Sequence, residues 1–597
     1  MDAPIDRPET PPRWRLDDLY TGRDDPGIEA DLAAAAVLAD QLAGLEGAFV
    51  AARGEPAKLG ALIDRGIDLY ERGVDKAWGV AAFASLAAST DHDDPAWARL
   101  EADVRERLSA NDARTLFFSL ELNTLEDSEI AAGLAAHPAA ARWAPWLRRV
   151  RLSRPHELTP DLERMVVDRA PAVANWSRLH DDILGRLVAR VGRERLTLAE
   201  ALNRLSDPSA ARRKAAAQGL GQALAEREET LALVYNTLAA EKQVEDRWRR
   251  FADPAAPRHL ANEVPAEAVA ALETAVVAAY EKLSWRYYRL KAKAMGLRTL
   301  NYWDRSAPLT EAPPRCYSWG EAKARALEAF GGLSPTFAGA AERFLAAPWT
   351  DAEPRKGKQS GAYSHPVTAN RHPYVFLNYM GERGDVLTLA HELGHAVHQT
   401  LAAPNGTLLA DTPLTLAETA SIFGEGLVFE HLLAEAAGAE RRDLLAGRIE
   451  DALNSVVRQI AFHRFETRFH AQRQAGEVSP EAIGAIWLEV MGESLGPAVR
   501  LNAGYQHYWA YVSHFVHTPF YVYAYAFGNL LVEALMAARA SDPAGFAPRY
   551  EALLAAGGTR TCVEALAPFS LDPRQRSFWD AGCDRLARLV DEFEALV

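Results

Sequence analysis

Two histidines four residues apart place the strongest constraint on the fold of this chain. In the sequence His391-Glu392-x-x-His395, positions four apart lie on one face of a helix, so both imidazoles can bind a single metal ion. Glu392 is rotated about 100° around the helix axis, which places it near the ion but off the line of the ligands. This position suits a base that acts on a metal-bound water. We therefore predict a helix here, with Asp385 as its N-cap.

Gly394 lies inside this predicted helix. A glycine costs about 1 kcal/mol of helix propensity relative to alanine. We therefore expect another part of the chain to pack closely against this turn. The spacing of the histidines also has a plainer interpretation, because two hydrogen-bonded core histidines without a metal would show the same pattern.

Glu418 is the predicted third metal ligand. Catalytic zinc takes three protein ligands and leaves one position for water, and a helix that begins near Thr415 can pass back beside the first one. However, Thr415-x-x-Glu418 also fits a capping box, in which the glutamate only binds the N-cap amide. Glu425 and His398 are further candidates. We expect Glu425 to accept a hydrogen bond from a ligand imidazole, and His398 to pack or form a hydrogen bond.

Composition excludes several classes of partner. The chain has 597 residues and a net charge of −15, which argues against nucleic acid or an anionic membrane, since either partner requires a basic face. Its three scattered cysteines form no disulfide framework, and the acidic first residues contain no apolar signal segment. These features predict a cytoplasmic protein. The most membrane-like run, residues 519–532, is too short to cross a bilayer.

Helical periodicity covers most of the sequence. We expect an N-terminal helical domain over residues 1–205 and a catalytic domain over residues 206–597, with an interruption at Pro171 in an otherwise helical run from 161 to 191. Residues 360–365 and 374–379 are short β-like runs on either side of a turn, which predicts a hairpin just before the metal helix. A substrate backbone could add as a strand to this hairpin, near Gly361 and Tyr363.

The richest cluster of hydrogen-bond donors elsewhere comprises His514, His517, Tyr521, Tyr523 and Tyr525. Thr518-Pro519 predicts the start of a helix, which would place Tyr521 and Tyr525 on one face, with Tyr523 roughly opposite. Donors of this kind can face the oxyanion that forms when a peptide is hydrolysed. An aromatic core helix is the alternative interpretation.

With these residues identified, the chain resembles the thimet oligopeptidase-like zinc metallopeptidases, and most closely their oligoendopeptidase F branch. The matching segments are residues 388–398, 418–421, 514–515 and 520–528, together with the N-terminal opening 14–19. The resemblance implies a mainly α fold of neurolysin type. Such a fold is a two-lobed helical body with a deep central channel and a small antiparallel β-sheet beside the active site. The chain departs from thimet oligopeptidase itself in having no glycine between His514 and Phe520.

The resemblance also implies the function. It suggests a zinc-dependent endopeptidase with one Zn²⁺ per chain that hydrolyses internal bonds of short unstructured oligopeptides. The implied metal ligands are His391, His395 and Glu418, the general base is Glu392, the further catalytic residues are His514, Tyr521 and Tyr525, and the substrate contacts include His517 and Tyr523.

Two other functions remain open from the sequence. An exopeptidase on the same scaffold, such as a carboxypeptidase or dipeptidase, would need the same metal chemistry but would trim chain ends. A non-catalytic peptide-binding scaffold would keep the channel alone. The sequence does not predict side-chain preference or oligomeric state, and a monomer is compatible with it.

Overall fold

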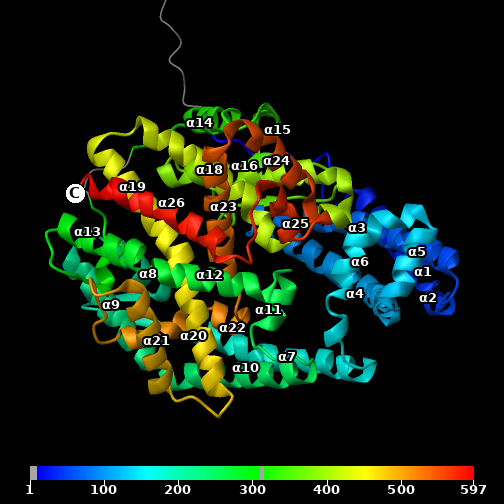
Figure 1. Ribbon diagram of the computed structural model, residues 1–597, viewed down its shortest axis with the longest axis horizontal. Helices are drawn as coiled ribbons and strands as arrows, with labels where there is room; N and C mark the ends of the chain where they lie inside the picture. Colours follow the sequence, from blue (N-terminus) through cyan, green and yellow to red (C-terminus); the bar gives the residue numbers. More distant parts are fainter. Residues whose placement is uncertain (1–9, 310–314) are drawn as a thin grey trace, which may run out of the picture. The chain divides into compact units, whose positions relative to one another are not determined.

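The protein consists of two compact units, each assembled from three separate segments of the chain. The structure is a computed structural model that describes residues 10–309 and 315–597, and it is mainly helical with small sheets, as predicted (Figure 1). Unit 1 comprises the described parts of 1–154, 314–432 and 542–570, and unit 2 those of 155–313, 433–541 and 571–597. These two units are defined by compactness. The predicted division into an N-terminal helical domain, 1–205, and a catalytic domain, 206–597, stays a prediction.

Unit 1 contains the helix with the two histidines. Its helices are α1 (Pro26–Ala43), α2 (Ala48–Ala51), α3 (Pro56–Thr90), α4 (Pro95–Thr124), α5 (Asp127–Ala136), α6 (Ala144–Arg151), α14 (Trp319–Gly331), α15 (Pro335–Ala346), α16 (Arg383–Ala402), α17 (Thr407–Ala410), most of α18 (Leu414–Glu435), α24 (Pro543–Ala555) and α25 (Cys562–Leu566). The long helices α1, α3 and α4 pack against one another, and a core cluster that includes Trp14 joins them to the sheet.

The predicted hairpin is confirmed in unit 1. Strands β5 (Tyr363–His365) and β6 (Tyr374–Phe376) pair antiparallel, with Ser364 opposite Val375. Strand β4 (Thr350–Asp351) adds in parallel on the other side of β6, so β5 is at an edge of the three-stranded sheet. Trp14 packs on this sheet, with its ring centre 5.7 Å from that of Tyr374.

Unit 2 contains the predicted donor cluster. Its helices are α7 (Pro160–Gly185), α8 (Leu198–Asn203), α9 (Ala210–Ala225), α10 (Glu228–Trp248), α11 (Ala256–Ala261), α12 (Ala266–Ala279), α13 (Arg286–Ala294), α19 (Gly438–Ala452), α20 (Arg458–Arg473), α21 (Pro480–Leu495), α22 (His514–His517), α23 (Tyr523–Ser541) and α26 (Arg576–Glu594). Strands β1 (Val188–Val191) and β2 (Glu194–Thr197) form a hairpin, and β3 (Leu300–Asn301) pairs in parallel with β7 (Val499–Arg500).

Three local expectations for unit 2 are wrong. Helix α7 continues through Pro171 without interruption. The run predicted to be helical up to residue 191 instead ends at Gly185, and β1 follows, because Gly192 at φ 62° permits a tight turn into β2. Helix α23 begins at Tyr523 rather than at Pro519, since Phe520 has a φ of 60°, which no helix accommodates.

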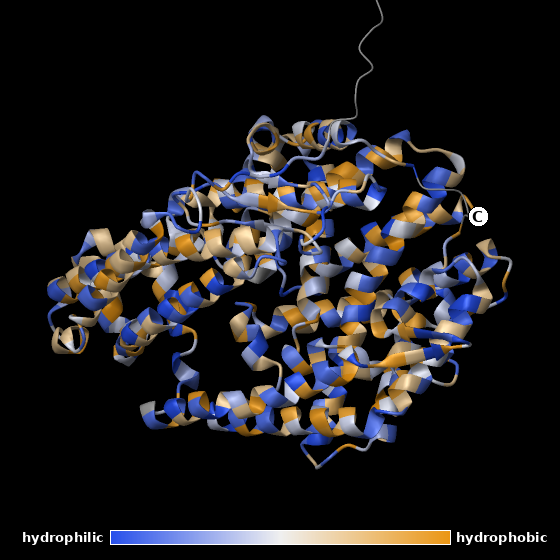
Figure 2. Ribbon diagram, turned by 180° about the vertical axis from the view of Figure 1, so that it is seen from behind, coloured by the Kyte–Doolittle hydropathy of each residue, from blue (hydrophilic) through white to orange (hydrophobic). Residues whose placement is uncertain are grey.

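Hydrophobic and hydrophilic residues alternate along the helices in the manner of amphipathic elements (Figure 2). The segment Pro26–Ala51 has the length and apolar composition of a membrane-crossing helix. In the structure it is two helices, and its residues Leu38, Leu42 and Phe49 lie in a core cluster of unit 1. The segment 519–532, the most membrane-like run by inspection of the sequence, lies largely in the buried helix α23.

Candidate metal centre and active site

The helix with the two histidines begins three residues earlier than predicted. Glu382 is the N-cap of α16, and Asp385 occupies the third helical position of a capping box. The Asp385 carboxylate accepts hydrogen bonds from the backbone N–H groups of Met380 and Glu382, at 2.8 and 2.9 Å. Asp385 therefore stabilises the helix start, as expected of an acidic residue there, but from inside the first turn.

Gly394 allows α16 to approach α18 closely, as its presence in the helix predicts. A Cβ atom at Gly394 would lie 2.4 Å from the carbonyl oxygen of Ala420 and 2.7 Å from Cα of Ser421. Gly424 repeats this contact one turn later, with the carbonyl oxygen of Ala390 at 3.1 Å from the same hypothetical atom. Only glycine fits at the first crossing, and this close approach brings the start of α18 to the histidines.

The three predicted metal ligands meet at this crossing. The Oε2 atom of Glu418 lies 3.3 Å from Nε2 of His391 and 3.4 Å from Nε2 of His395. In a tetrahedral zinc site with bonds of about 2.05 Å, neighbouring ligand atoms are about 3.3 Å apart. Two imidazole nitrogens and one carboxylate oxygen are also a donor set that zinc prefers. Both the spacing and the chemistry of these side chains therefore fit the ion.

Glu425 supports His391 from the other side of its ring. Its Oε2 atom lies 3.4 Å from Nδ1 of His391, so this carboxylate can fix the tautomer and orientation of the imidazole, as predicted. Burial lowers the pKa of His391, but the hydrogen bonds to Glu418 and Glu425 outweigh this effect and raise it to about 10. The two carboxylates therefore favour positive charge on the His391 ring.

Glu392 is buried beside the two histidines. Its side chain is in an environment that raises its pKa, because desolvation outweighs the attraction of His391 and His395. Its Oε2 atom is buried and, among the described residues, has no hydrogen-bond partner. Buried carboxylate oxygens are almost always paired, so this atom is available to a group that the described residues do not supply.

The capping-box alternative for Glu418 is not supported. Helix α18 begins at Leu414, so Thr415 lies inside its first turn and not at the N-cap. The Glu418 carboxylate instead accepts a hydrogen bond of 2.8 Å from the hydroxyl of Ser421. Helix α24 supports this turn from the third segment of unit 1, because the hydroxyl of Tyr550 donates to the carbonyl oxygen of Thr419 at 3.0 Å.

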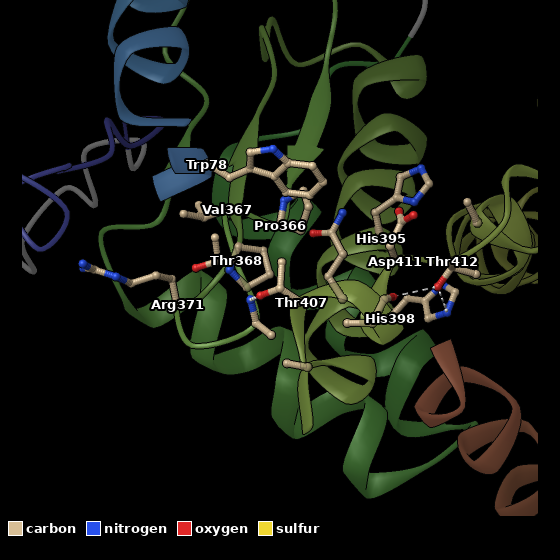
Figure 3. A pocket seen from close by; sticks show the side chains of 16 residues that line it. Trp78, Pro366, Val367, Thr368, Arg371, His395, His398, Thr407, Asp411 and Thr412 are labelled. Carbon is tan, nitrogen blue, oxygen red and sulfur yellow. Dashed lines mark hydrogen bonds between the residues drawn. The ribbon is translucent and has the colours of Figure 1, made fainter. Parts of the chain in front are cut away.

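His398 does not join the ligand cluster, as predicted. It is 4% exposed, and its Nε2 atom lies 3.5 Å from the hydroxyl of Thr412. Burial lowers its pKa to about 4, so the ring is neutral. Together with His395 it lines one side of a cavity of about 180 Å³, and Trp78 and Val367 line the other side (Figure 3).

The two predicted substrate residues of the hairpin, Gly361 and Tyr363, differ in how accessible they are to a substrate. Gly361 is exposed, with a φ of 91°. Tyr363 instead stacks on Phe376, with its hydroxyl 2.6 Å from that of Ser89, so its polar atom is already used within unit 1. At the edge of β5, the carbonyl oxygen of Ser364 accepts a hydrogen bond of 3.3 Å from Nε2 of Gln399.

Sequence reasoning missed Gln399. It lies on α16 four residues after His395, and its Oε1 atom accepts a hydrogen bond of 2.9 Å from the Ser364 hydroxyl. Gln399 thus connects the metal helix to the edge strand. Because it lies four residues after His395, the sequence alone could have placed Gln399 on the same helix face as the metal ligands.

In unit 2, the structure brings His514, Tyr521 and Tyr525 together. Nε2 of His514 lies 3.1 Å from the hydroxyl of Tyr525, and the ring centres of Tyr521 and Tyr525 are 5.4 Å apart. Burial lowers the pKa of His514, and nearby His517 lowers it further. Tyr525 remains 41% exposed. The three predicted catalytic residues therefore form one accessible cluster.

A strained turn precedes these tyrosines. Phe520 has a φ of 60°, and its N–H donates to Oε1 of Glu466 at 2.7 Å. Left-handed backbone is costly for a bulky residue, so the surroundings must enforce it. Burial raises the pKa of Glu466 to about 8. Tyr521 thus lies in a turn before α23, held by a residue of α20.

The two remaining predicted substrate residues lie apart from this cluster or at its margin. Tyr523 is fully buried, and its hydroxyl meets Nδ1 of His259 at 3.0 Å and Nδ2 of Asn262 at 2.9 Å. Because this burial leaves no surface for a substrate, we leave Tyr523 out of the proposed substrate contacts. His517 is partly exposed, and its Nε2 atom lies 2.8 Å from Oδ1 of Asp181.

Comparison with known proteins gives consistent matches. A family model described as Peptidase family M3 matches residues 204–585, and one described as Oligopeptidase F matches residues 121–188. An oligoendopeptidase F homolog of Lactococcus lactis is 28% identical over 58% of this chain and 58% of its own length. The oligopeptidase PepB of Streptococcus agalactiae is 24% identical over 81% of each chain. The chain thus aligns with little more than half the length of the first relative.

Solved structures share the fold. A candidate peptidase from Chlamydophila abortus superimposes with a TM-score of 0.85 and 20% identity, covering 99% of this chain and 100% of that one. Oligoendopeptidase-F from Enterococcus faecium gives a TM-score of 0.71 and 18% identity, covering 95% and 99% of the two chains.

Proposed function

Because the chain belongs to peptidase family M3, we propose that it is a zinc-dependent endopeptidase that cuts internal bonds of short, unstructured oligopeptides. The observation that carries this proposal is the arrangement of His391, His395 and Glu418 around one point, at the spacing of tetrahedral ligands. Relatives named oligoendopeptidase F support the choice of oligopeptides as substrates.

The proposed ligands are these three residues, with one Zn²⁺ per chain. When bound, the ion would act as a Lewis acid on the scissile carbonyl and would make a water molecule easier to deprotonate. Glu425 would keep the His391 ring in the orientation that leaves Nε2 facing the other ligands. Gly394 would allow the helix crossing on which the position of Glu418 depends.

Glu392 is the proposed general base. Its buried Oε2 atom, which has no hydrogen-bond partner in the described part of the chain, can take a proton from the attacking water and later deliver it to the leaving amine. Burial brings its pKa up from its ordinary value of 4.5. A base whose pKa is closer to the working pH transfers protons in both directions more readily.

His514, Tyr521 and Tyr525 are the proposed donors to the oxyanion. This proposal rests on the resemblance and on the cluster itself, in which an imidazole nitrogen and a phenol hydroxyl lie 3.1 Å apart at an accessible surface. Donors that are already in place before reaction are the ones that stabilise developing charge best. His517 and Gly361 are proposed as further substrate contacts.

Glu392→Gln provides the sharpest test of the mechanism. The variant keeps the shape of the side chain but cannot accept the proton, so turnover should fall by about 10²–10⁴-fold. Bound zinc, measured by elemental analysis, should stay at the wild-type level. The exposed Glu342 provides a control, since Glu342→Gln should change neither quantity. Wild-type turnover in Glu392→Gln would refute the assignment.

Cleavage of a quenched peptide separates this function from the alternatives. With both ends of the peptide blocked, an endopeptidase still produces internal fragments, whereas a carboxypeptidase or dipeptidase produces none. Cleavage of unblocked peptides only at their ends would favour the exopeptidase. Absence of cleavage in zinc-loaded protein would favour a binding scaffold. The three cysteines, which are scattered through the sequence at positions 316, 562 and 583, support the further proposal of a reducing, cytoplasmic location.

A further inference from the structure

A second cluster of metal-binding side chains lies in unit 2. His180 and Asp181 belong to the end of α7, and His517 is the last residue of α22. Each residue offers one ligand atom, and these atoms all lie within 4.8 Å of one another. We propose that His180, Asp181 and His517 form a second site, which binds a divalent transition-metal ion independently of the centre in unit 1.

The distances within the cluster are close to those of metal ligands. Oδ1 of Asp181 lies 3.5 Å from Nδ1 of His180 and 2.8 Å from Nε2 of His517. Ligand atoms of a tetrahedral ion are about 3.3 Å apart, so only the second distance must lengthen. The Asp181 side chain is 54% exposed and that of His517 38%. Both can adjust by a few tenths of an ångström without disturbing the core.

The hydrogen bonding of His180 favours a cation beside its Nδ1 atom. Its Nε2 atom lies 3.0 Å from the carbonyl oxygen of Ala510, and a carbonyl can only accept, so Nε2 carries the proton. In the neutral ring, Nδ1 then presents a lone pair to the carboxylate of Asp181. Two acceptors that face each other repel unless a cation lies between them.

A second proton on His180 is the alternative source of that positive charge. The ring is only 2% exposed, and burial disfavours the charged imidazolium. The backbone carbonyl of Ala510 orients the ring in the way that carbonyls commonly orient metal-binding histidines. A simple hydrogen bond between His517 and Asp181 explains the 2.8 Å contact but leaves the position of Nδ1 of His180 unexplained.

The ligand set selects the class of metal. Two imidazoles and one carboxylate suit Zn²⁺, Co²⁺, Ni²⁺ or Cu²⁺, whereas Mg²⁺ and Ca²⁺ prefer oxygen ligands throughout. Two of the three side chains are exposed, so water can complete the coordination and the ion can exchange with solvent. An ion bound here would hold α22, which begins with His514, against α7.

Zinc stoichiometry of the full chain tests the proposal. The purified protein, stripped of metal, is dialysed against buffered Zn²⁺ and analysed for bound zinc, with Co²⁺ absorption as a second readout. Asp181→Ala removes one ligand at an exposed position. The matched control is His507→Gln, which breaks a similar pair, 2.7 Å between Nδ1 of His507 and Oε1 of Glu228, that has no third ligand among the described residues.

Wild type and His507→Gln should bind two zinc ions, and Asp181→Ala one. Loss of a direct ligand should weaken the second equivalent by more than about 100-fold, since outer groups alone cost 10–100-fold. Equal zinc content and equal Co²⁺ spectra in wild type and Asp181→Ala would overturn the proposal. His391→Ala isolates the second site. This variant should bind one zinc ion, and the double variant that also carries Asp181→Ala should bind none. Both results are expected whether or not the centre in unit 1 binds zinc.

Discussion

Gly394→Ala directly tests the helix crossing on which the proposed metal centre depends. The added Cβ atom would lie 2.4 Å from the carbonyl oxygen of Ala420, whereas ordinary contact begins at 3.4 Å. Both neighbours at this position are backbone atoms, so α18 itself must move away from α16, by about 1 Å in a close-packed interior. Glu418 lies half a turn before Ala420 and moves with it.

Two energy terms oppose each other in this variant. Alanine improves helix propensity by about 1 kcal/mol, whereas overpacking of a close contact costs about 1–3 kcal/mol. We therefore expect a net loss of stability of up to about 2 kcal/mol. The effect on the site should be larger, because a carboxylate displaced by about 1 Å leaves the tetrahedral spacing, and zinc affinity should fall by about 10–100-fold.

Gly384→Ala is the matched control. Gly384 lies in the first turn of the same helix, and a Cβ atom there meets nothing within 4 Å. This variant gains helix propensity without a clash, so its zinc affinity should equal that of wild type and its melting temperature should not fall. Competition with a chromophoric chelator measures the affinity. The reasoning is refuted if Gly394→Ala binds zinc as tightly as Gly384→Ala does.

Two further predictions concern the edge strand and the strained turn. Ser364→Pro should raise KM for peptides by about tenfold with little change in kcat, because proline removes an N–H from the edge of β5 that a substrate strand would use; unchanged KM would contradict strand addition. Glu466→Gln should change how stability depends on pH. Burial raises the pKa of Glu466 from its ordinary 4.5 to about 8, so the native state holds a proton that the unfolded chain releases between these values, and stability falls as pH rises through this window, by at most about 1.4 kcal/mol per pH unit. Denaturant unfolding from pH 4 to 9 should show this slope in wild type and a weaker slope in Glu466→Gln, and equal slopes would contradict the burial argument.

Local spacing was sufficient to predict the centre of the site. The two histidines share a helix face because of the helical period, and Gly394 signalled a close neighbour because glycine is costly inside a helix. Glu418 was harder, since its local sequence also fitted a capping box. The position of the α18 start, one residue before Thr415, and the contacts of Glu418 with the two histidines separate the two interpretations, and helix boundaries are the least certain part of sequence reasoning.

The features that sequence reasoning missed depend on contacts between distant segments. Nothing near Phe520 indicates a left-handed backbone; the cause is Glu466 on another helix. Likewise, His180 and Asp181 form a plain helical pair until folding brings His517 beside them. The hairpin of β1 and β2 was missed because residues 188–191 follow directly on the helical pattern before them, although Val188 and Val191 favour a strand and Gly192 favours a turn.

The division of unit 1 into three chain segments has a consequence for synthesis on the ribosome. Helices α16 and α18 emerge long before α24, whose Tyr550 donates to the carbonyl oxygen of Thr419, directly beside Glu418. A nascent chain that ends before residue 550 therefore exposes the surface that α24 later covers, and chaperones recognise such surfaces. We expect this unit to mature only after residues 542–570 have been synthesised.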